Sequence, residues 1–335
     1  MRLPRFDYLK PETLEQALDL LASHGEGAKI LAGGTDLLVR MKKGLLTPKV
    51  LISLKALDEL SYIQTDAEAI QIGARTPLAD IIASDLIQTK ARALAQACEK
   101  IGAITLQHYR GTLGGNILQD NRCHHYNQSD FHRSGRQACH KAGGKICYAR
   151  DFSDRCNSTC QSDGATALMA LGAKLVLTGK GAQRTVEMKD FYTLDGIKPH
   201  AIEPHELLTR IIIPLEGTRS AYHRLAYRSA IDYPLVCAGV AFKISADQKE
   251  QIEEARIVVG AMGRAPLFLA QAAASLKGTS FRDHEAFQQA AQNAMDSSAA
   301  FAVHNVGSTL EYRCAMVAQM VVRALEDAAA QAEKA

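Results

Sequence analysis

Hydrophobic residues in the first part of the chain predict short helices and strands in alternation. Within residues 11–23 the apolar residues recur at helical spacing after Pro11, which predicts a helix. Apolar runs at 29–32 and 50–54 predict two strands, and a Gly-Gly turn followed by a short amphipathic stretch lies between them. We therefore expect residues 1–57 to form a small α/β unit around that turn.

A second unit follows from about Ile63 onward. Apolar and polar residues alternate over 70–74, as in a half-buried strand, and Pro77 begins a helix that is followed by a longer one over 90–101. The other elements expected in this unit are a helix at 165–171, a hairpin of strands at 175–177 and 184–186, and a strand at 207–213.

The last third predicts a separate domain, because the polar residues 215–220 interrupt the pattern. Its expected elements are strands at 222–228, 236–244 and 254–260, then helices near 266–276, 283–296 and 308–331. An antiparallel sheet covered on one face by helices is an α+β arrangement. The predicted fold class is therefore α+β, with a first domain over 1–216 (subdomains about 1–57 and 58–216) and a second over 220–330.

Composition narrows the class of protein. The chain has 335 residues, of which 47% are hydrophobic and 22% charged, as is ordinary for a globular enzyme. Its net charge of +3 is too small and too dispersed to indicate nucleic acid or an anionic membrane as a partner. No apolar run approaches the ~20 residues of a membrane span, and the N-terminus lacks the apolar core of an export signal. We expect a cytoplasmic protein.

The cysteines are the unusual feature of this composition. Five of the eight lie between residues 123 and 160. In a cytoplasmic protein of this size, such a local group favours metal or redox chemistry over a disulfide framework. No Ser/His/Asp or Cys/His arrangement typical of a hydrolase is present, and no residue is assigned as catalytic.

Two glycine turns could hold phosphate. The turns Gly33-Gly34 and Gly114-Gly115 each let consecutive backbone N–H groups point into one concavity. Neither fits the Rossmann or P-loop pattern, and either one alone would be an ordinary loop. Two such turns in one α/β domain favour a dinucleotide with a pyrophosphate.

These two turns, the run from Asp163 to Ala173 and the segment from Tyr222 to Leu235 occur in an order that resembles a known family. It is the FAD-binding subunit of the xanthine dehydrogenase family of molybdenum hydroxylases, and the match spans nearly the whole chain. The resemblance implies a vanillyl-alcohol-oxidase (PCMH)-type FAD-binding domain in two subdomains. A small C-terminal α+β domain of the CO dehydrogenase flavoprotein type would follow it.

The same resemblance implies which residues bind the cofactor. They are Lys29, Ile30, Leu31, Ala32, Gly33, Gly34, Thr35, Asp36, Thr112, Leu113, Gly114, Gly115, Asn116, Gln119, Asp163 and Arg224. Most members of the family have lysine where this chain has Arg224, so a planar guanidinium replaces a compact ammonium there.

A cysteine-bearing segment lies between the second glycine turn and Asp163. Asn116 and Asp163 are 47 positions apart, and about forty residues, roughly 120–162, appear as an insert relative to the family. The insert has the spacing C-x15-C-x7-C-x8-C, without the C-x2-C pairs of zinc ribbons or ferredoxins. The spacing alone leaves an iron–sulfur cluster and a structural zinc ion equally open.

The insert resembles that of the β subunits of the 4-hydroxybenzoyl-CoA reductases, which hold a 4Fe–4S cluster. That resemblance implies four ligands: Cys123, Cys139, Cys147 and Cys156. Cys160 falls outside the ligand pattern and is expected to be a spare thiol. Three other cysteines are expected to be small core residues: Cys98, Cys237 and Cys314. The histidines of the insert are expected to form hydrogen bonds or face solvent: His124, His125, His132 and His140.

The resemblance also implies partners. A large molybdopterin subunit and a small subunit with 2Fe–2S clusters would join this chain in a dimer of heterotrimers. Reduced ferredoxin would supply electrons through 4Fe–4S and FAD to the partner subunits, for the reductive removal of hydroxyl from 4-hydroxybenzoyl-CoA. Two alternatives remain: the FAD subunit of another molybdenum hydroxylase, acting on an aldehyde, xanthine or another N-heterocycle, and a FAD protein whose insert is a zinc-stapled docking module.

Overall fold

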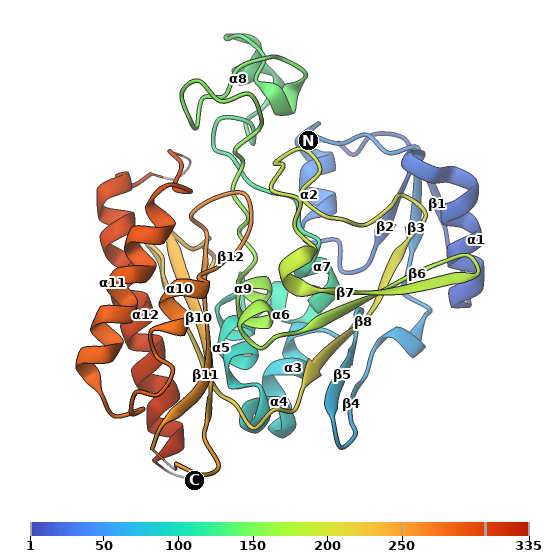
Figure 1. The fold of residues 1–335 in the computed structure, drawn as a ribbon. Helices are drawn as coiled ribbons and strands as arrows, with labels where there is room; N and C mark the ends of the chain where they lie inside the picture. The colour runs from blue at the N-terminus through green and yellow to red at the C-terminus, as the bar shows by residue number, and fades with distance from the viewer. Residues whose placement is uncertain (1, 249, 305–306, 334–335) are drawn as a thin grey trace.

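Three β-sheets organise the chain in the computed structural model, which describes residues 2–248, 250–304 and 307–333 (Figure 1). The first sheet is three-stranded and parallel, in the order β1-β3-β2. Its strands are β1 (Asp7–Leu9), β2 (Ala28–Leu31) and β3 (Val50–Ser53). Helix α1 (Leu14–His24), capped by the Thr13 side chain, buries Ala17, Leu18 and Leu21 in the same core as β3.

The second sheet is antiparallel and five-stranded, in the order β4-β5-β8-β6-β7. Its strands are β4 (Ile63–Thr65), β5 (Ala69–Gly73), β6 (Lys174–Gly179), β7 (Ala182–Glu187) and β8 (Leu207–Pro214). The helices of this unit are α3 (Leu78–Ala83), α4 (Asp85–Lys90), α5 (Arg92–Lys100), α6 (Gln107–Arg110), α7 (Leu113–Ile117) and α9 (Asp163–Ala170). Every residue of α9 is buried, which makes this helix the centre of the molecule.

The third sheet is antiparallel, in the order β12-β11-β10-β9. Its strands are β9 (Arg219–Leu225), β10 (Val236–Ile244), β11 (Ile252–Gly260) and β12 (Leu267–Phe268). Helices α10 (Ala270–Ala274), α11 (His284–Ala299) and α12 (Leu310–Ala332) follow β12 in sequence.

Both faces of this third sheet are covered, which corrects the prediction of helices on one face only. Ala238 and Val240 share the core of α11 and α12, whereas Tyr222 and Cys237 share the core of α5 and α9. Alternate residues of each strand point to opposite faces, so both faces need apolar cover. The C-terminal domain is thereby joined to the second subdomain through a common core.

Two further predictions are corrected by local structure. The helix expected over 266–276 is limited to 270–274, because residues 267–268 pair with β11 instead. The second glycine turn is a short helix, α7, whose N-cap Thr112 accepts a hydrogen bond from the N–H of Gly115 at 3.1 Å. Among the described residues, no helix is long and apolar enough to cross a lipid bilayer.

The insert leaves the second subdomain and returns to it at one point. Arg122 and Thr159 pair there through two backbone hydrogen bonds of 2.8 and 2.7 Å. Beyond this base, the segment carries α8 (Asp130–Ser134) and a 3-10 turn, η3 (His140–Ala142), and projects from the body of the molecule (Figure 1). It has little regular structure of its own, so contacts with neighbouring segments must hold it.

Candidate functional site

The two glycine turns meet in the folded chain. A Cβ atom on Gly33 would lie 1.6 Å from the carbonyl oxygen of Arg110, so only glycine lets the first turn pack against the backbone that leads into the second. Gly34 has a φ of +73°, in the region that favours glycine. A Cβ on Gly114 would lie 2.7 Å from the carbonyl oxygen of Ala74. Close backbone packing thus holds both turns in one place.

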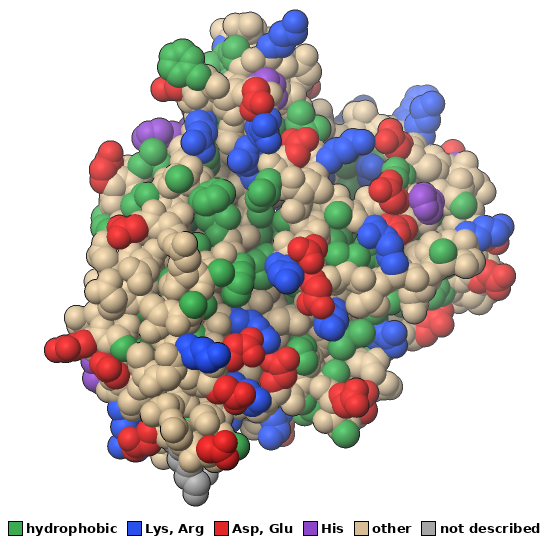
Figure 2. Space-filling view, viewed as in Figure 1, with side chains coloured by type: hydrophobic (Ala, Val, Ile, Leu, Met, Phe, Trp, Pro, Cys, Tyr) green, Lys and Arg blue, Asp and Glu red, His purple; other side chains and the backbone are tan. Residues whose placement is uncertain are grey.

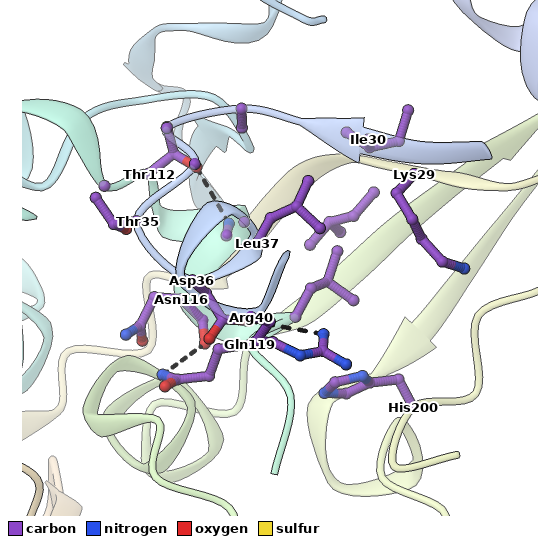
Figure 3. Close-up of a pocket in the computed structure, with 18 of the residues that line it drawn as sticks. Lys29, Ile30, Thr35, Asp36, Leu37, Arg40, Thr112, Asn116, Gln119 and His200 are labelled. Atoms are coloured by element: carbon purple, nitrogen blue, oxygen red, sulfur yellow. Dashed lines mark hydrogen bonds and ion pairs between the residues drawn. The ribbon is translucent and has the colours of Figure 1, made fainter. Parts of the chain in front are cut away.

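A cavity of about 1140 Å³ lies along this contact (Figure 3). Most of the predicted cofactor-binding residues line it: Lys29, Ile30, Ala32, Gly33, Gly34, Thr35, Asp36, Thr112, Gly114, Gly115, Asn116, Gln119 and Asp163. Leu31, Leu113 and Arg224 do not line it. Leu113 is fully buried in the core, and the Leu31 side chain lies beside Gly34. The structure therefore brings thirteen of the sixteen residues to one cavity.

Other lining residues were not predicted as cofactor-binding, among them Arg40, Gln161 and His200. Arg40 Nε, Gln161 Oε1 and His200 Nε2 are buried and have no hydrogen-bond partner among the described residues. Buried polar atoms without partners are rare in folded proteins, and these fit a polar ligand with hydrogen-bonding groups of its own. Arg40 lies in α2 (Leu37–Lys42), four residues after the N-cap Asp36, a spacing that brings the two side chains together and is visible in the sequence.

His200 lies across the cavity from the first glycine turn, near Arg40 (Figure 3). Its ring stacks on Phe191 and meets Tyr192 edge-on, both at 5.4 Å between ring centroids. Burial lowers the pKa of His200 to about 4, so the imidazole is neutral at pH 7. This side chain can therefore offer the cavity a hydrogen bond but no charge.

Asp163 begins α9 and joins the cavity to the C-terminal domain. Its Oδ1 accepts a hydrogen bond of 2.5 Å from the Tyr222 hydroxyl, and Arg224 Nη1 lies 3.2 Å from the same atom. Burial raises the pKa of Asp163, and Arg224 and Tyr222 oppose that rise. Arg224, predicted from the family to contact the flavin, reaches the cavity in this structure through Asp163.

The four predicted cysteine ligands lie in the insert, and three pairs of them interact electrostatically. Burial raises the pKa of the Cys123 thiol to about 11, backbone N–H groups of His125 and Tyr126 oppose the rise, and nearby Cys156 and Cys139 add to it. Burial also raises the pKa of Cys156, and Cys147 adds to that effect. The Cys123 thiol thus lies within electrostatic reach of Cys139 and Cys156, and the Cys156 thiol within reach of Cys147.

Their arrangement does not form the ligand set of a single metal ion. In the parts of the chain that the structure describes, no three His, Cys, Asp or Glu side chains are close enough for that. Tetrahedral zinc with bonds of ~2.3 Å would require thiolates only about 3.8 Å apart. Backbone N–H groups beside the sulfur atoms of Cys123 and Cys156 are donors of the kind that tune thiolate ligands in metal sites.

Cys160 lies apart from these four cysteines. It is buried in the core of the second subdomain, and burial raises its pKa to about 12 while the N–H of Ser162 and the Tyr192 hydroxyl oppose the rise. Among the histidines of the insert, His140 Nε2 lies 3.0 Å from the carbonyl oxygen of Ser153 and His125 Nδ1 lies 3.5 Å from Arg136. Both rings thus lie beside protein hydrogen-bonding groups.

The two-part fold, with a cavity at paired glycine turns, is the arrangement expected of a dinucleotide-binding subunit with a separate C-terminal domain. Residues 4–216 match the family described as FAD binding domain in molybdopterin dehydrogenase. Residues 220–328 match the CO dehydrogenase flavoprotein C-terminal domain. The chain belongs to the FAD-binding subunits of the molybdenum hydroxylase family, of the CO dehydrogenase medium-chain type, and is an oxidoreductase subunit.

Individual relatives agree with this class. The carbon monoxide dehydrogenase medium chain of Afipia carboxidovorans is 29% identical, with 98% of each chain covered. The nicotinate dehydrogenase FAD-subunit of Eubacterium barkeri is 28% identical over 82% of this chain and 80% of its own length. The structure of carbon monoxide dehydrogenase from Hydrogenophaga pseudoflava superimposes with a TM-score of 0.78 at 28% identity, covering 99% of both chains. FAD binding and family are thus confirmed.

These comparisons support the broader of the functional predictions. They favour a FAD subunit of a molybdenum hydroxylase and do not specifically support 4-hydroxybenzoyl-CoA reductase. The 4Fe–4S cluster also receives no support from them. Both finer assignments therefore rest on the insert alone.

Proposed function

We propose that this chain is an electron-transfer subunit that binds FAD in the cavity and a 4Fe–4S cluster in the insert. The observation that carries the proposal is that Cys123 lies near Cys139 and Cys156, and Cys156 near Cys147, in a loop whose base, at Arg122, also lines the cavity. Two cofactor sites on one short stretch of chain suit a subunit that passes electrons.

The cavity residues suit the parts of FAD. The backbone N–H groups of Gly33 and Gly34 would hold the pyrophosphate, as expected of consecutive N–H groups in a glycine turn. The N–H groups of residues 113–116 instead bond to Thr76, Ala74 and Thr112, so the second turn would contribute shape to the cavity and not a phosphate cradle. Asp163, fixed by Tyr222 and Arg224, would orient the flavin ring through hydrogen bonds. FAD supplies the ability to exchange one or two electrons, and the protein supplies binding and orientation.

Cys123, Cys139, Cys147 and Cys156 would hold the cluster. Cys123 and Cys156 are buried; the N–H groups of His125 and Tyr126 lie beside the Cys123 sulfur, and that of Ser158 lies 3.5 Å from the Cys156 sulfur. Such donors stabilise thiolates and set the potential of iron–sulfur sites.

Metal analysis of cysteine variants tests this assignment. The full chain, purified without oxygen, should contain about four irons with a broad visible absorption beside the flavin bands, as four thiolates can hold. Cys139→Ser should lose the iron and keep FAD, whereas the matched control Cys160→Ser should keep both. One zinc per chain with a pure flavin spectrum would instead establish the zinc-stapled alternative.

We further propose partners and a substrate for the assembled enzyme. A molybdopterin-binding large subunit and a 2Fe–2S small subunit would join this chain in a dimer of heterotrimers, with reduced ferredoxin as the donor. The substrate would be 4-hydroxybenzoyl-CoA, which takes up two electrons and two protons to give benzoyl-CoA and water. The resemblance of the insert supports this substrate.

The second candidate is an oxidising molybdenum hydroxylase, which the relatives favour. The purified complex decides between the two. Conversion of 4-hydroxybenzoyl-CoA with reduced ferredoxin would support the reductase. Oxidation of an aldehyde or an N-heterocycle, with no turnover of the thioester, would show that the cluster-bearing subunit serves an oxidising enzyme.

A further inference from the structure

Lys141 forms a buried ion pair with Asp120, where the insert begins. Its Nζ lies 2.8 Å from Asp120 Oδ1, and the two side chains are only 6% and 9% exposed. The ammonium also donates to the carbonyl oxygens of Asn121 (3.0 Å) and Gly196 (2.9 Å) and to Ser158 Oγ (3.4 Å). This lysine is therefore fixed in one position, and its charge acts in a medium where water screens little.

Asp120 extends this contact to the cavity. Arg40 Nη2 lies 3.1 Å from Asp120 Oδ2, and Arg40 Nη1 lies 3.9 Å from Asp36 Oδ2. Asp36 also forms an ion pair with Arg122. Asp36, Arg40 and Arg122 line the cavity, whereas Asp120 and Lys141 do not. A residue of the insert is thus linked to the first glycine turn by a continuous chain of ion pairs.

The charges of this chain do not cancel. It contains the three cations Lys141, Arg40 and Arg122 and the two carboxylates Asp36 and Asp120. One positive charge is left over, next to the turn that would face a pyrophosphate. Without the lysine, the two carboxylates would balance both arginines, and these ion pairs would add no net positive charge to the attraction that the N–H groups of the turn exert on an anion.

We propose that Lys141 is a positioning residue of the flavin site: it neutralises Asp120, so that Arg40 and Arg122 present a net positive charge to the pyrophosphate of FAD. The inference rests on the proposed placement of FAD in this cavity. Coupling of this kind is reciprocal, so bound FAD also stabilises the position of Lys141 and of the insert around it.

FAD titration of the deflavinated full chain, followed by flavin fluorescence, tests the inference. Lys141→Met should weaken FAD binding about ten-fold or more, since it removes a poorly screened charge. The control Lys145→Met, at an exposed lysine of the same segment that does not line the cavity, should leave the affinity unchanged.

A double variant separates charge from structural damage. Asp120→Asn combined with Lys141→Met restores the excess of one positive charge and should recover FAD affinity to within about three-fold of the unaltered chain. Riboflavin, which has no pyrophosphate, should bind both single lysine variants equally well.

Three results would overturn the inference: unchanged FAD affinity in Lys141→Met, a double variant as weak as the single one, or an equal loss of riboflavin binding. Failure of the unaltered chain to bind FAD would instead refute the proposed flavin site, and this inference with it.

Discussion

At Gly33 the chain has no room for a single methyl group, because a Cβ atom would meet the Arg110 carbonyl oxygen at 1.6 Å. Gly33→Ala must therefore push the two glycine turns apart. We expect a loss of about 1–3 kcal/mol in the free energy of unfolding, typical of overpacking, and a preparation depleted in FAD. Urea denaturation and the ratio of flavin to protein measure the two effects.

The control for this substitution is Gly27→Ala. A Cβ atom on Gly27 would have no neighbour within 4 Å, and its φ lies outside the left-handed region. The Gly27→Ala variant should retain FAD, and its free energy of unfolding should change by less than about 0.5 kcal/mol. Equal behaviour of the two variants would contradict the close packing at Gly33.

His200 predicts a pH dependence of stability. Its pKa is lowered to about 4 in the folded chain, against an ordinary value of 6.5. Between pH 6.5 and 4 the unfolded chain therefore binds more protons at this position, and the free energy of unfolding falls as the pH falls through that window. His200→Gln should show a shallower decline in urea denaturation at pH 7, 6 and 5. Identical pH profiles for both proteins would show that His200 titrates normally.

Helix α12 holds three loops through one buried side chain. Arg313, fully buried, donates to the carbonyl oxygens of Leu235 (2.9 Å), Val303 (2.7 Å) and Ala261 (2.5 Å). Arg313→Ala would leave these oxygens without their charged donor, at an expected cost of about 3–5 kcal/mol. Denaturant unfolding checks this value.

The same helix supplies the control, because Arg323 is exposed. Arg323→Ala should change stability by less than about 0.5 kcal/mol. A cost below 1 kcal/mol for Arg313→Ala would mean that water replaces the lost hydrogen bonds.

The longer elements could be predicted from sequence because their periodicity is local. Strands β3, β8 and β10 and helices α1, α11 and α12 lie close to their predicted positions. Strands β1 and β12 could not be predicted, because three and two residues are too few to show a periodic pattern. They are strands only because they pair with β3 and β11. The run of buried apolar residues along β10 was a missed sign of a sheet covered on both faces.

For the cavity as well, some residues could be predicted from the sequence and others could not. Its glycine turns and Asp163 carry motifs, so the sequence predicts them. Gln161 and His200 lie in segments without a motif, and the segment 228–233 closes the cavity from the C-terminal domain. Their meeting depends on the packing of three units, which no local pattern encodes.

The insert is attached to both domains. Its base pairs within the second subdomain, and Ala149 accepts a backbone hydrogen bond of 3.0 Å from His304 in the C-terminal domain. Arg150 donates to the carbonyl oxygen of Ala300 at 3.0 Å. These contacts explain how a segment with little secondary structure is held against both domains.

The net charge of the chain is concentrated in this insert. Residues 120–162 contain seven Lys and Arg against four Asp, an excess of +3 that equals the net charge of all 335 residues. Basic side chains lie on and below the projecting segment (Figure 2). Phe131 and Phe152 are almost entirely exposed on it, and Phe152 has a φ of +52°. Exposed aromatics within a basic surface suit an acidic electron-transfer protein.

Reduced ferredoxin, added to the assembled complex without oxygen, tests that surface. The double substitution Phe131→Ser with Phe152→Ser should slow the second-order rate of reduction about ten-fold, because buried aromatic side chains often carry much of the binding energy at protein–protein interfaces. The FAD and iron contents should stay unchanged. Tyr8→Ser, at a half-exposed aromatic of the first subdomain, is the control and should have no effect. The rate for the unaltered complex should fall with rising salt, because added ions screen the attraction between opposite charges. A rate independent of salt and of both phenylalanines would place electron entry on another face of the complex.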